Sequence, residues 1–448
     1  MWTAGIGIGA LWVISRALMV CEWWLRCQFI SSDVAYYFAQ MGNPNASALV
    51  EYPTPILWLM RLLHLLSFGN YNLFLDMVII LMVMLDALVA ACLFWRASPA
   101  AAAYWVVFLA LLGPILWFRI DLIPATCVTL ALLTLWQEPR ISGVLLAVGA
   151  ATKLWPALLI LPVIGRSKAA RQRLAGFAAA GAIFALVSLV LNGWARSISP
   201  VTWQSERGLQ IESLAATWSM ILHATKPQAV IVQMSPYHAY EIFGEGALAG
   251  QAAASIMMAM AIVFTGIVAF MLAVWPIWQQ RRNRGRKPLP RRGRRSYAMV
   301  LSATAIVLAM IAANKTFSPQ YLIWLAGPLG LILAHARTHN EKRAAAVVAV
   351  TGCTIAGLTQ LDFPLYYMGL ITNPLGDIGV TAILVLRNIL VAALTLMLMI
   401  WALRASWQTI HLPHRMNSKK NSHSMAKSED HRKQCRILAG RSSATTSG

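Results

Sequence analysis

The chain has 448 residues, of which 58% are hydrophobic and only 12% are charged. A soluble domain of this length carries about a quarter charged residues, so the composition excludes a water-soluble globular protein. The formal net charge is +21, but nine of the 37 cations fall in residues 281–295 and nine in residues 404–448. Such clusters beside apolar segments are typical of membrane topology and of attraction to anionic lipid at the cytoplasmic face, so we exclude nucleic acid as a partner.

Ten apolar segments have the length and composition of helices that cross a bilayer. In chain order they are residues 5–29, 72–95, 101–118, 122–137, 174–194, 247–277, 297–313, 321–336, 344–360 and 380–403. The first has no charged segment before it and no small-residue cleavage site, which indicates a retained span rather than a signal peptide. The predicted fold class is an all-α polytopic membrane protein of about ten transmembrane helices.

A further apolar segment, residues 141–165, lies between two basic connections and is interrupted by Lys153-Leu154-Trp155-Pro156. Proline removes a backbone donor and kinks a helix, and such breaks survive at membrane depth only beside protein or a water-filled cavity. We therefore predict a re-entrant hairpin of two short half-helices. An isolated charge there costs roughly 2.5–3.5 kcal/mol, so Lys153 is expected either to have a use or to extend to the interface.

Basic and acidic connections alternate along the chain, and the positive-inside rule then predicts the orientation in the cytoplasmic membrane. Both termini are predicted inside, and nine of the 16 acidic residues fall in outer connections. Carboxylate chemistry is therefore expected at the outer face. The predicted organisation is a membrane-embedded domain over 1–404, with outer loops 30–71, 195–245 and 361–379 and a basic cytoplasmic loop 278–296, followed by a disordered basic cytoplasmic tail over 405–448.

Charged residues near the ends of the first spans are candidates for chemistry. Asp33 follows the first span at the membrane surface, where a carboxylate can remove the proton of an incoming hydroxyl. The alternative is that Asp33 caps the next helix. Glu51 and Tyr52 end the same loop. Arg119 and Asp121 occupy a very short outer turn, where charges are costly unless they are used or form a mutual ion pair.

Two later outer segments are dense in groups that suit sugar hydroxyls and a phosphate. Arginine binds phosphate through two donors, and amides and carboxylates match vicinal hydroxyls. An ordinary solvated loop is the alternative for the first segment and a simple turn for the second, although a simple turn would not need a lysine. The candidates are Arg207, Gln210 and Glu212 in the first segment and Lys315, Ser318, Gln320 and Tyr321 in the second.

The sequence contains no GxxxxGK[ST], HExxH or GxSxG motif, no GxGxxG opening a helix after a strand, and no metal-binding cysteine spacing. Nucleotide-driven transport and serine or zinc hydrolysis lose support, and we predict neither a cofactor nor a metal. A secondary transporter or lipid flippase stays an alternative because Asp76, Asp86 and Arg387 lie within predicted spans. Interhelical pairing is the other use of these charges. A non-enzymatic assembly subunit is a further alternative.

Several outer-face pieces match a known family in order, across roughly residues 10–340. The pieces are Asp33 with Tyr36-Tyr37, Glu51-Tyr52-Pro53, Arg119-x-Asp121-Leu122-x-Pro124, Thr152-Lys153-Leu154-Trp155-Pro156, Arg207-Gly208-Leu209-Gln210-Ile211-Glu212-Ser213 and Lys315-x-Phe317-Ser318-Pro319-Gln320-Tyr321. They resemble the integral-membrane glycosyltransferases of the C-type superfamily, specifically the family-87 polyprenyl-phosphate-mannose-dependent mannosyltransferases of actinobacterial envelopes.

The resemblance implies an inverting transfer in which Asp33 is the general base on an acceptor hydroxyl and polyprenyl phosphate leaves. Mannose is preferred to arabinose as the donor sugar, the acceptor is a glycolipid or polysaccharide of the cell envelope, and the product is α-linked, with α-1,2 expected. Many members of the superfamily carry two adjacent acids at the first position, whereas here Ser32 precedes Asp33.

The resemblance also implies roles for the remaining candidates. The donor phosphate would be bound by Lys315, Arg207, Arg119 and Lys153. The sugar and the acceptor would be contacted by Glu51, Tyr52, Asp121, Gln210, Glu212, Ser318, Gln320 and Tyr321.

Overall fold

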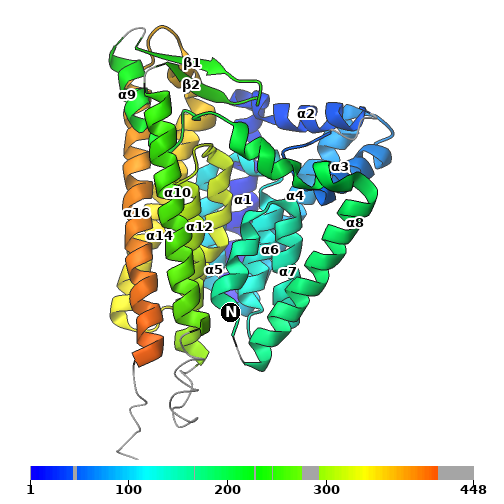
Figure 1. Ribbon diagram of the computed structural model, residues 1–448, viewed down its shortest axis with the longest axis vertical. Helices are drawn as coiled ribbons and strands as arrows, with labels where there is room; N and C mark the ends of the chain where they lie inside the picture. The colour runs from blue at the N-terminus through cyan, green and yellow to red at the C-terminus, as the bar shows by residue number, and fades with distance from the viewer. Residues whose placement is uncertain are drawn as a thin grey trace, which may run out of the picture.

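The computed structural model describes residues 2–43, 48–165, 167–226, 229–244, 246–274 and 292–411. Helices make up most of this part of the chain, and the long ones run side by side along the vertical axis of Figure 1. Seven of the described helices are long and apolar enough to cross a membrane. They are α1 (Trp2–Arg26), α4 (Tyr71–Arg96), α8 (Lys168–Glu206), α10 (Ala247–Ala269), α12 (Arg292–Ala312), α14 (His339–Gln360) and α16 (Ile378–His411).

Shorter helices complete the bundle. Three of them, α5 (Pro99–Leu112), α6 (Leu122–Leu133) and α13 (Ile323–His335), coincide with predicted spans and lie in its interior together with α12, where most side chains are buried. Each of the ten predicted spans therefore corresponds to one helix, and the all-α polytopic membrane fold is confirmed. The central helices are short because turns at Pro114–Trp117 and Pro319–Leu322 interrupt them at the upper end of the molecule.

The predicted re-entrant segment forms α7 (Pro139–Thr152) and a 3-10 stretch, Trp155–Val163, that returns beside it. Buried Arg173 of α8 joins the two ends of this hairpin, because its guanidinium donates to the carbonyl of Leu135 at 2.5 Å and to that of Val163 at 2.6 Å. A Cβ on Gly143 of α7 would lie 1.9 Å from the carbonyl oxygen of Arg173, so the two helices approach as closely as glycine permits. The hairpin therefore starts and ends at the same end of the bundle.

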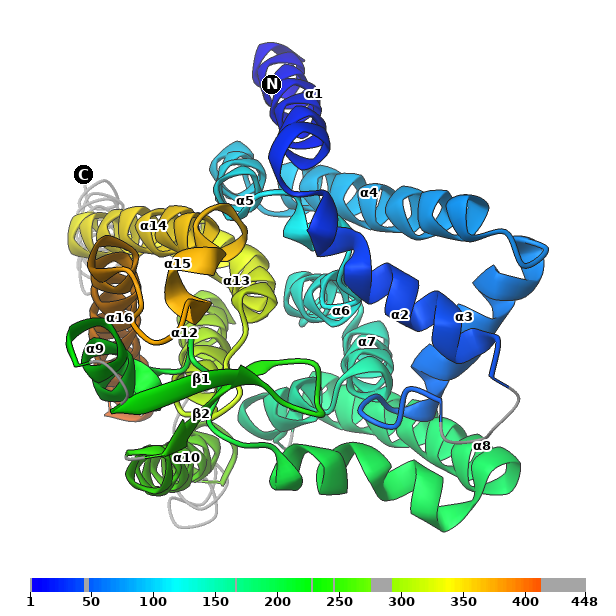
Figure 2. The same ribbon diagram turned by 90° about the horizontal axis from the view of Figure 1, so that it is seen from above.

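The long segment predicted as the outer loop 195–245 is more ordered than a loop. Helix α8 continues to Glu206 across a kink at Gly193, whose φ of +74° is a left-handed conformation that suits glycine. The chain after the kink crosses the upper end of the bundle, as Figure 2 shows. Next come α9 (Thr217–Thr225) and an antiparallel hairpin of β1 (Val230–Met234) and β2 (Tyr240–Gly244).

The β-hairpin is a departure from the all-helical prediction. Three consecutive β-branched residues, Val230, Ile231 and Val232, favour an extended strand, and Pro236 in the following connection favours a turn. The strong hydropathy of the neighbouring spans conceals this short pattern. Small α2 (Ser32–Met41), α3 (Thr54–Leu66) and α15 (Tyr367–Ile371) also lie at this upper end (Figures 1 and 2).

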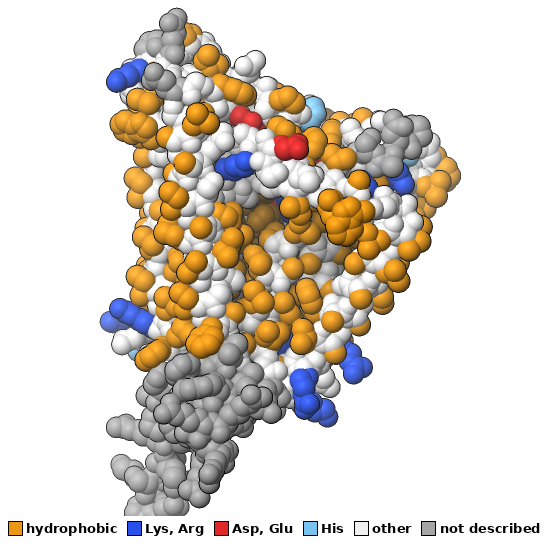
Figure 3. Space-filling view, viewed as in Figure 1, with side chains coloured by type: hydrophobic (Ala, Val, Ile, Leu, Met, Phe, Trp, Pro, Cys, Tyr) orange, Lys and Arg blue, Asp and Glu red, His pale blue; other side chains and the backbone are white. Residues whose placement is uncertain are grey.

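The start of α1 and the end of α16 lie at the lower end in Figure 1. On the face seen in Figure 3, the acidic side chains lie at the upper end, whereas lysines and arginines also gather at the lower end. Of the predicted cytoplasmic loop 278–296, residues 278–291 lie outside the described residues, and the rest begins α12. The predicted disordered tail 405–448 starts too early, because α16 continues to His411; residues 412–448 lie outside the described part.

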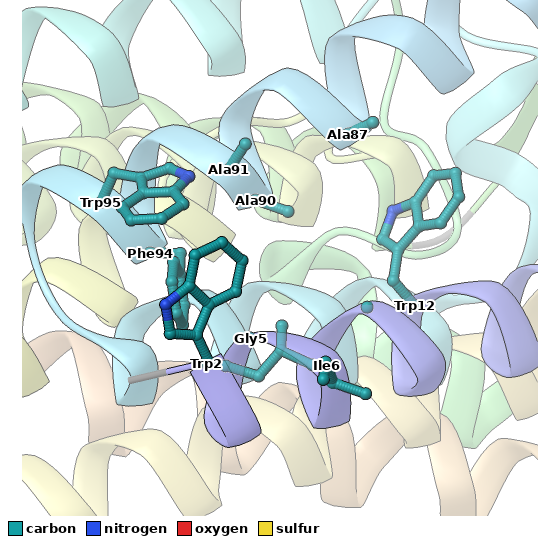
Figure 4. Close-up of a pocket in the computed structure, with 11 residues that line it drawn as sticks. Trp2, Gly5, Ile6, Trp12, Ala87, Ala90, Ala91, Phe94 and Trp95 are labelled. Atoms are coloured by element: carbon teal, nitrogen blue, oxygen red, sulfur yellow. The ribbon is translucent and has the colours of Figure 1, made fainter.

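An apolar groove of about 520 Å³ opens between the first half of α1 and the last turns of α4. Figure 4 shows Trp2, Phe94 and Trp95 gathered at one end of the groove and Trp12 at the other. Its other lining residues are Gly5, Ile6, Ile8, Gly9, Ala87, Ala90 and Ala91. None of these described lining residues is ionisable, so they offer no groups for acid–base chemistry.

A buried ion pair joins α1 to α4 beside this groove. The Arg16 guanidinium donates to both oxygens of Asp86, at 2.8 and 2.9 Å. The indole Nε1 atoms of Trp12 and Trp105 donate to the same carboxylate at 2.9 and 2.8 Å. The interhelical pairing considered for Asp86 is therefore confirmed, and four donors from α1 and α5 satisfy the charge.

We predict that Arg16→Gln lowers the free energy of unfolding by about 3–5 kcal/mol, because it leaves the buried Asp86 carboxylate without its cation. Denaturant titration of the purified protein in detergent measures this change. The matched control is Arg96→Gln, which removes the exposed ion pair of Arg96 with Glu138 and should change stability little. An equal loss of unfolding free energy in the two variants would contradict a stabilising role for the buried Arg16–Asp86 pair.

Candidate active site

The sequence-predicted residues converge at the upper end of the bundle. Figure 3 shows acidic and basic side chains close together there, above a recess between helices. Five segments meet around it: the start of α2, the turn at 118–121, the tip of the re-entrant hairpin, the segment 207–213 and the turn 313–321.

Asp33 lies in the first turn of α2 and pairs with Arg119. Its Oδ2 is 2.7 Å from Nη1 of Arg119, and 37% of the Asp33 side chain stays accessible. The same Nη1 donates to the carbonyl of Ile30 at 3.2 Å, which fixes the arginine against the start of the loop. Ser31, not Asp33, occupies the N-cap position of α2, so the capping alternative for Asp33 is wrong.

The surroundings of Asp33 favour a base. Burial among protein atoms raises the pKa of this carboxyl group, and the charge of Arg119 opposes that rise. A raised pKa makes the carboxylate a stronger base, while the paired cation keeps the ionised form accessible. Asp33 can therefore accept a proton from a hydroxyl that enters the recess.

Lys153 pairs with Asp121 rather than extending to the interface. Its Nζ lies 2.6 Å from Oδ1 of Asp121, which also accepts from Nε1 of Trp324 at 2.8 Å. The ammonium lies 4.7 Å from the ring centroid of Tyr321 and 5.2 Å from that of Trp324. The mutual Arg119–Asp121 pair considered from sequence is therefore wrong, because each residue pairs with a partner from another segment.

Stacked aromatic rings support this lysine. Trp324 lies between Tyr321 and Trp155, with ring centroids 4.4 and 4.7 Å away. Among the described residues, Oδ2 of Asp121 and Nε of Arg119 are buried without a hydrogen-bond partner. Buried polar atoms are rarely left so, and these two are available to a polar ligand.

Glu51 and Tyr52 are held beside Asp33 by the last part of α8. Arg196 donates to the carbonyls of Leu49 and Tyr52 at 2.8 and 3.1 Å. Burial raises the pKa of Glu51, which accepts a hydrogen bond from Tyr36. Tyr52 places its hydroxyl 3.4 Å from that of Tyr37. These contacts line one wall of the recess with phenols and a second carboxyl group.

The segment 207–213 lies between β2 and the turn after α12. The amide of Gly208 donates to Oε2 of Glu241 at 3.2 Å, and Arg207 lies 3.9 Å from the other oxygen. The backbone amide of Gln210 donates to the carbonyl of Lys315 at 2.9 Å. The backbone of this segment also bonds to β2, where the amide of Ile242 donates to the carbonyl of Leu209 at 2.9 Å, and such pairing on both sides is inconsistent with an ordinary solvated loop.

Gln210 and Glu212 are buried, with exposed fractions of 4% and 1%. The side-chain amide of Gln210 donates to Ser318 Oγ at 2.8 Å and to the Glu212 carboxylate at 2.7 Å. Behind them, Arg387 of α16 donates to the carbonyl of Glu212 and lies 3.8 Å from Asp362. Glu212 is thus placed to hold Gln210 and the segment in position.

Lys315 and Gln320 complete the second predicted segment. Lys315 Nζ donates to the carbonyl of Ser205 at 2.9 Å and has no carboxylate partner among the described ion pairs. Burial lowers the pKa of Lys315, and the nearby Glu241 opposes that shift. Gln320 is half-buried on the same turn.

Sequence reasoning missed several residues around the recess. Trp324 follows Tyr321 by one helical turn, a spacing that places both rings on one face. Glu241 belongs to the acid-rich outer loop but carried no motif. Within the described residues no group of three His, Cys, Asp or Glu side chains is arranged to hold a metal ion.

Two of the three charges that would support a transport pathway have structural partners, and the third is exposed. Asp86 pairs with Arg16, and Arg387 lies beside Asp362, so the described structure gives neither charge to an open path. Asp76 is exposed on the outside of α4. The observation that supported a transporter is therefore removed.

Comparison with known proteins gives the chain a family. The sequence model of glycosyltransferase family 87 matches residues 50–287, more than half of the 448 residues. The matched range contains Arg119, Lys153 and Arg207, while Asp33 and Lys315 lie outside it. No curated protein matches the chain. The chain therefore belongs to glycosyltransferase family 87 and is a membrane-spanning glycosyltransferase.

Proposed function

We propose that this glycosyltransferase moves a hexose, with mannose preferred, from a polyprenyl-phosphate donor to a hydroxyl of a glycolipid or glycan. We place the reaction on the outer face of the cytoplasmic membrane. The observation that carries the proposal is the accessible Asp33 carboxylate, 2.7 Å from Arg119, in a recess that also receives Lys153. A lipid-linked donor suits a site outside the cytoplasm because it needs no cytosolic nucleotide.

The proposed transfer proceeds with inversion. The acceptor oxygen attacks the anomeric carbon on the face opposite the phosphate, while Asp33 takes the acceptor proton. The bond from the anomeric carbon to the phosphate oxygen breaks, and its electron pair goes to the phosphate. A β-linked donor then gives an α-linked product, for which we propose an α-1,2 linkage.

The departing phosphate needs fixed positive charge more than it needs a proton. Arg119 and Lys153 each have a carboxylate partner, so these four side chains have no net charge together. Lys315 donates only to a backbone carbonyl, and Arg207 lies 3.9 Å from Glu241. We therefore assign the phosphate to Lys315 and Arg207 first, with Arg119 and Lys153 closer to the reacting carbon.

A lipid-borne donor also suits the apolar surface around the recess. Helix α3 follows Glu51-Tyr52-Pro53 and exposes Leu62, Leu65 and Leu66. Beyond its end, the side chain of Phe68 is 91% exposed. An amphipathic helix of this kind lies in the membrane interface, where a polyprenyl chain is also found.

We predict that Asp33→Asn lowers kcat by about 10²–10⁴-fold, because the amide cannot take the acceptor proton. Transfer from radiolabelled polyprenyl-phosphate-mannose to a mannoside acceptor by the purified enzyme measures the loss. The matched control is Asp76→Asn, which changes an exposed carboxylate on α4. Unchanged transfer by Asp33→Asn would contradict the proposed role of Asp33 as the general base. If the enzyme used polyprenyl-phosphate-arabinose and not polyprenyl-phosphate-mannose, the proposed donor sugar would be arabinose instead of mannose.

We predict that the pH profile of kcat/KM has an acid limb set by Asp33. The base must be deprotonated, so the rate falls as pH falls through its raised pKa. Arg119→Gln removes the cation that lowers this pKa, and the acid limb should move to higher pH. A limb that stays in place, or moves to lower pH, would contradict the pairing of Arg119 with the catalytic carboxylate.

We predict that Gly208→Ala lowers transfer at least tenfold while the thermal unfolding temperature changes little. A Cβ at this position would lie 2.5 Å from Oε2 of Glu241 and displace the carboxylate beside Arg207. The matched control is Gly181→Ala on α8, where a Cβ meets nothing within 4 Å. Equal activity of both variants would show that the segment 207–213 need not be held as described.

A further inference from the structure

The turn of the β-hairpin has an unusual backbone. His238 has a φ of +55°, a left-handed conformation that is uncommon outside glycine but that histidine, asparagine and aspartate adopt more readily than other residues. The turn is closed by the amide of Ser235 on the carbonyl of Ala239 at 2.9 Å and by the amide of His238 on the carbonyl of Ser235 at 3.1 Å. These bonds fix the backbone of the turn and with it the direction of the Cα–Cβ bond of His238.

The hairpin lies across the upper end of the bundle (Figure 2), and contacts in and beside its turn hold it there. Beside its turn, Glu241 accepts from the backbone amide of Gly208 and pairs through its own backbone with Gln210. Near its tip, the ring of Tyr237 lies edge-on to Trp203 of α8, with centroids 4.9 Å apart. The turn is therefore placed by contacts with two neighbouring segments rather than by the strands alone.

His238 reaches the helix that carries the catalytic acid. Its ring centroid lies 5.4 Å from that of Tyr36. Tyr36 follows Asp33 by three residues on α2, so the two share one face of that helix. The His238 side chain is exposed, and in the described part of the chain its ring nitrogens have no hydrogen-bond partner.

Resting on the proposed function, we propose that His238 is an acceptor-binding residue. The hydroxyl that Asp33 deprotonates must lie beside Asp33, on the side of the sugar opposite the donor phosphate. The imidazole of His238 and the ring of Tyr36 bound the space next to this carboxylate, whereas Lys315 and Arg207 serve the phosphate. His238 then makes a hydrogen bond to a neighbouring hydroxyl of a sugar acceptor.

The backbone conformation provides a test that separates this role from a simple turn. Asparagine is enriched in the left-handed region and glycine enters it freely, so His238→Asn and His238→Gly preserve the turn. Only the imidazole is lost. A residue retained for the turn alone would leave both variants as active as the unchanged enzyme.

The experiment uses the purified full chain, polyprenyl-phosphate-mannose as donor and octyl α-mannoside as acceptor probe. Both variants should raise the KM for the acceptor about tenfold, as for one lost hydrogen bond, with the donor KM and the thermal unfolding temperature unchanged. The matched control is His339→Asn, which changes an exposed histidine at the start of α14.

An unchanged acceptor KM in both variants overturns the inference, and so does an equal rise in the donor KM. If both variants are as active as the unchanged enzyme, His238 serves only the turn, and the inference is also overturned. These failures differ from failure of the proposed function, in which the unchanged enzyme would transfer no sugar from a polyprenyl-phosphate donor.

Discussion

The ion pair of Lys153 with Asp121 is the contact on which the upper end of the molecule depends. A lysine at the tip of an apolar hairpin is costly in the membrane unless a carboxylate meets it. The pair forms at 2.6 Å and is surrounded by the rings of Tyr321 and Trp324. Because Lys153 comes from the hairpin, Asp121 from the 118–121 turn and the aromatic rings from the 313–324 region, one contact joins three parts of the chain.

The hairpin can deliver Lys153 only because its other end is also fixed. Arg173 joins Leu135 and Val163 at the base, and Gly143 allows α7 to approach α8 closely. Pro156 prevents a continuous helix through the tip and leaves the polar backbone beside the recess. The re-entrant hairpin, which differs from the continuous spanning helices, is thus the segment that brings the charge of Lys153 to the site.

Buried charges elsewhere follow the same rule. Arg16 and Asp86 satisfy one another with the help of two indoles, and Arg387 reaches the carbonyl of Glu212 while lying beside Asp362. The second group connects the last long helix to the segment that carries Gln210. These buried charges therefore serve assembly in this protein, and the accessible carboxylate of Asp33 stands apart from them.

Much of this protein could be predicted from its sequence. The spans, the broken hairpin and the family resemblance depend on hydropathy and short motifs, which are local properties of the chain. The candidates Asp33, Arg119 and Lys153 rest on charged side chains beside apolar runs, and Gln210 rests on a polar outer segment, so these hypotheses also come from local patterns.

The tertiary structure alone decided which partner each charge takes and what covers the site. Asp121 and Lys153 are 32 residues apart, and Gln210 and Ser318 are 108 apart. Such contacts depend on how helices pack, so no local pattern could distinguish the Asp33–Arg119 pair from the expected Arg119–Asp121 pair. The β-hairpin was missed because its five-residue strands are weak signals beside long hydrophobic helices, and its position over Asp33 depends on contacts with α8 and α2.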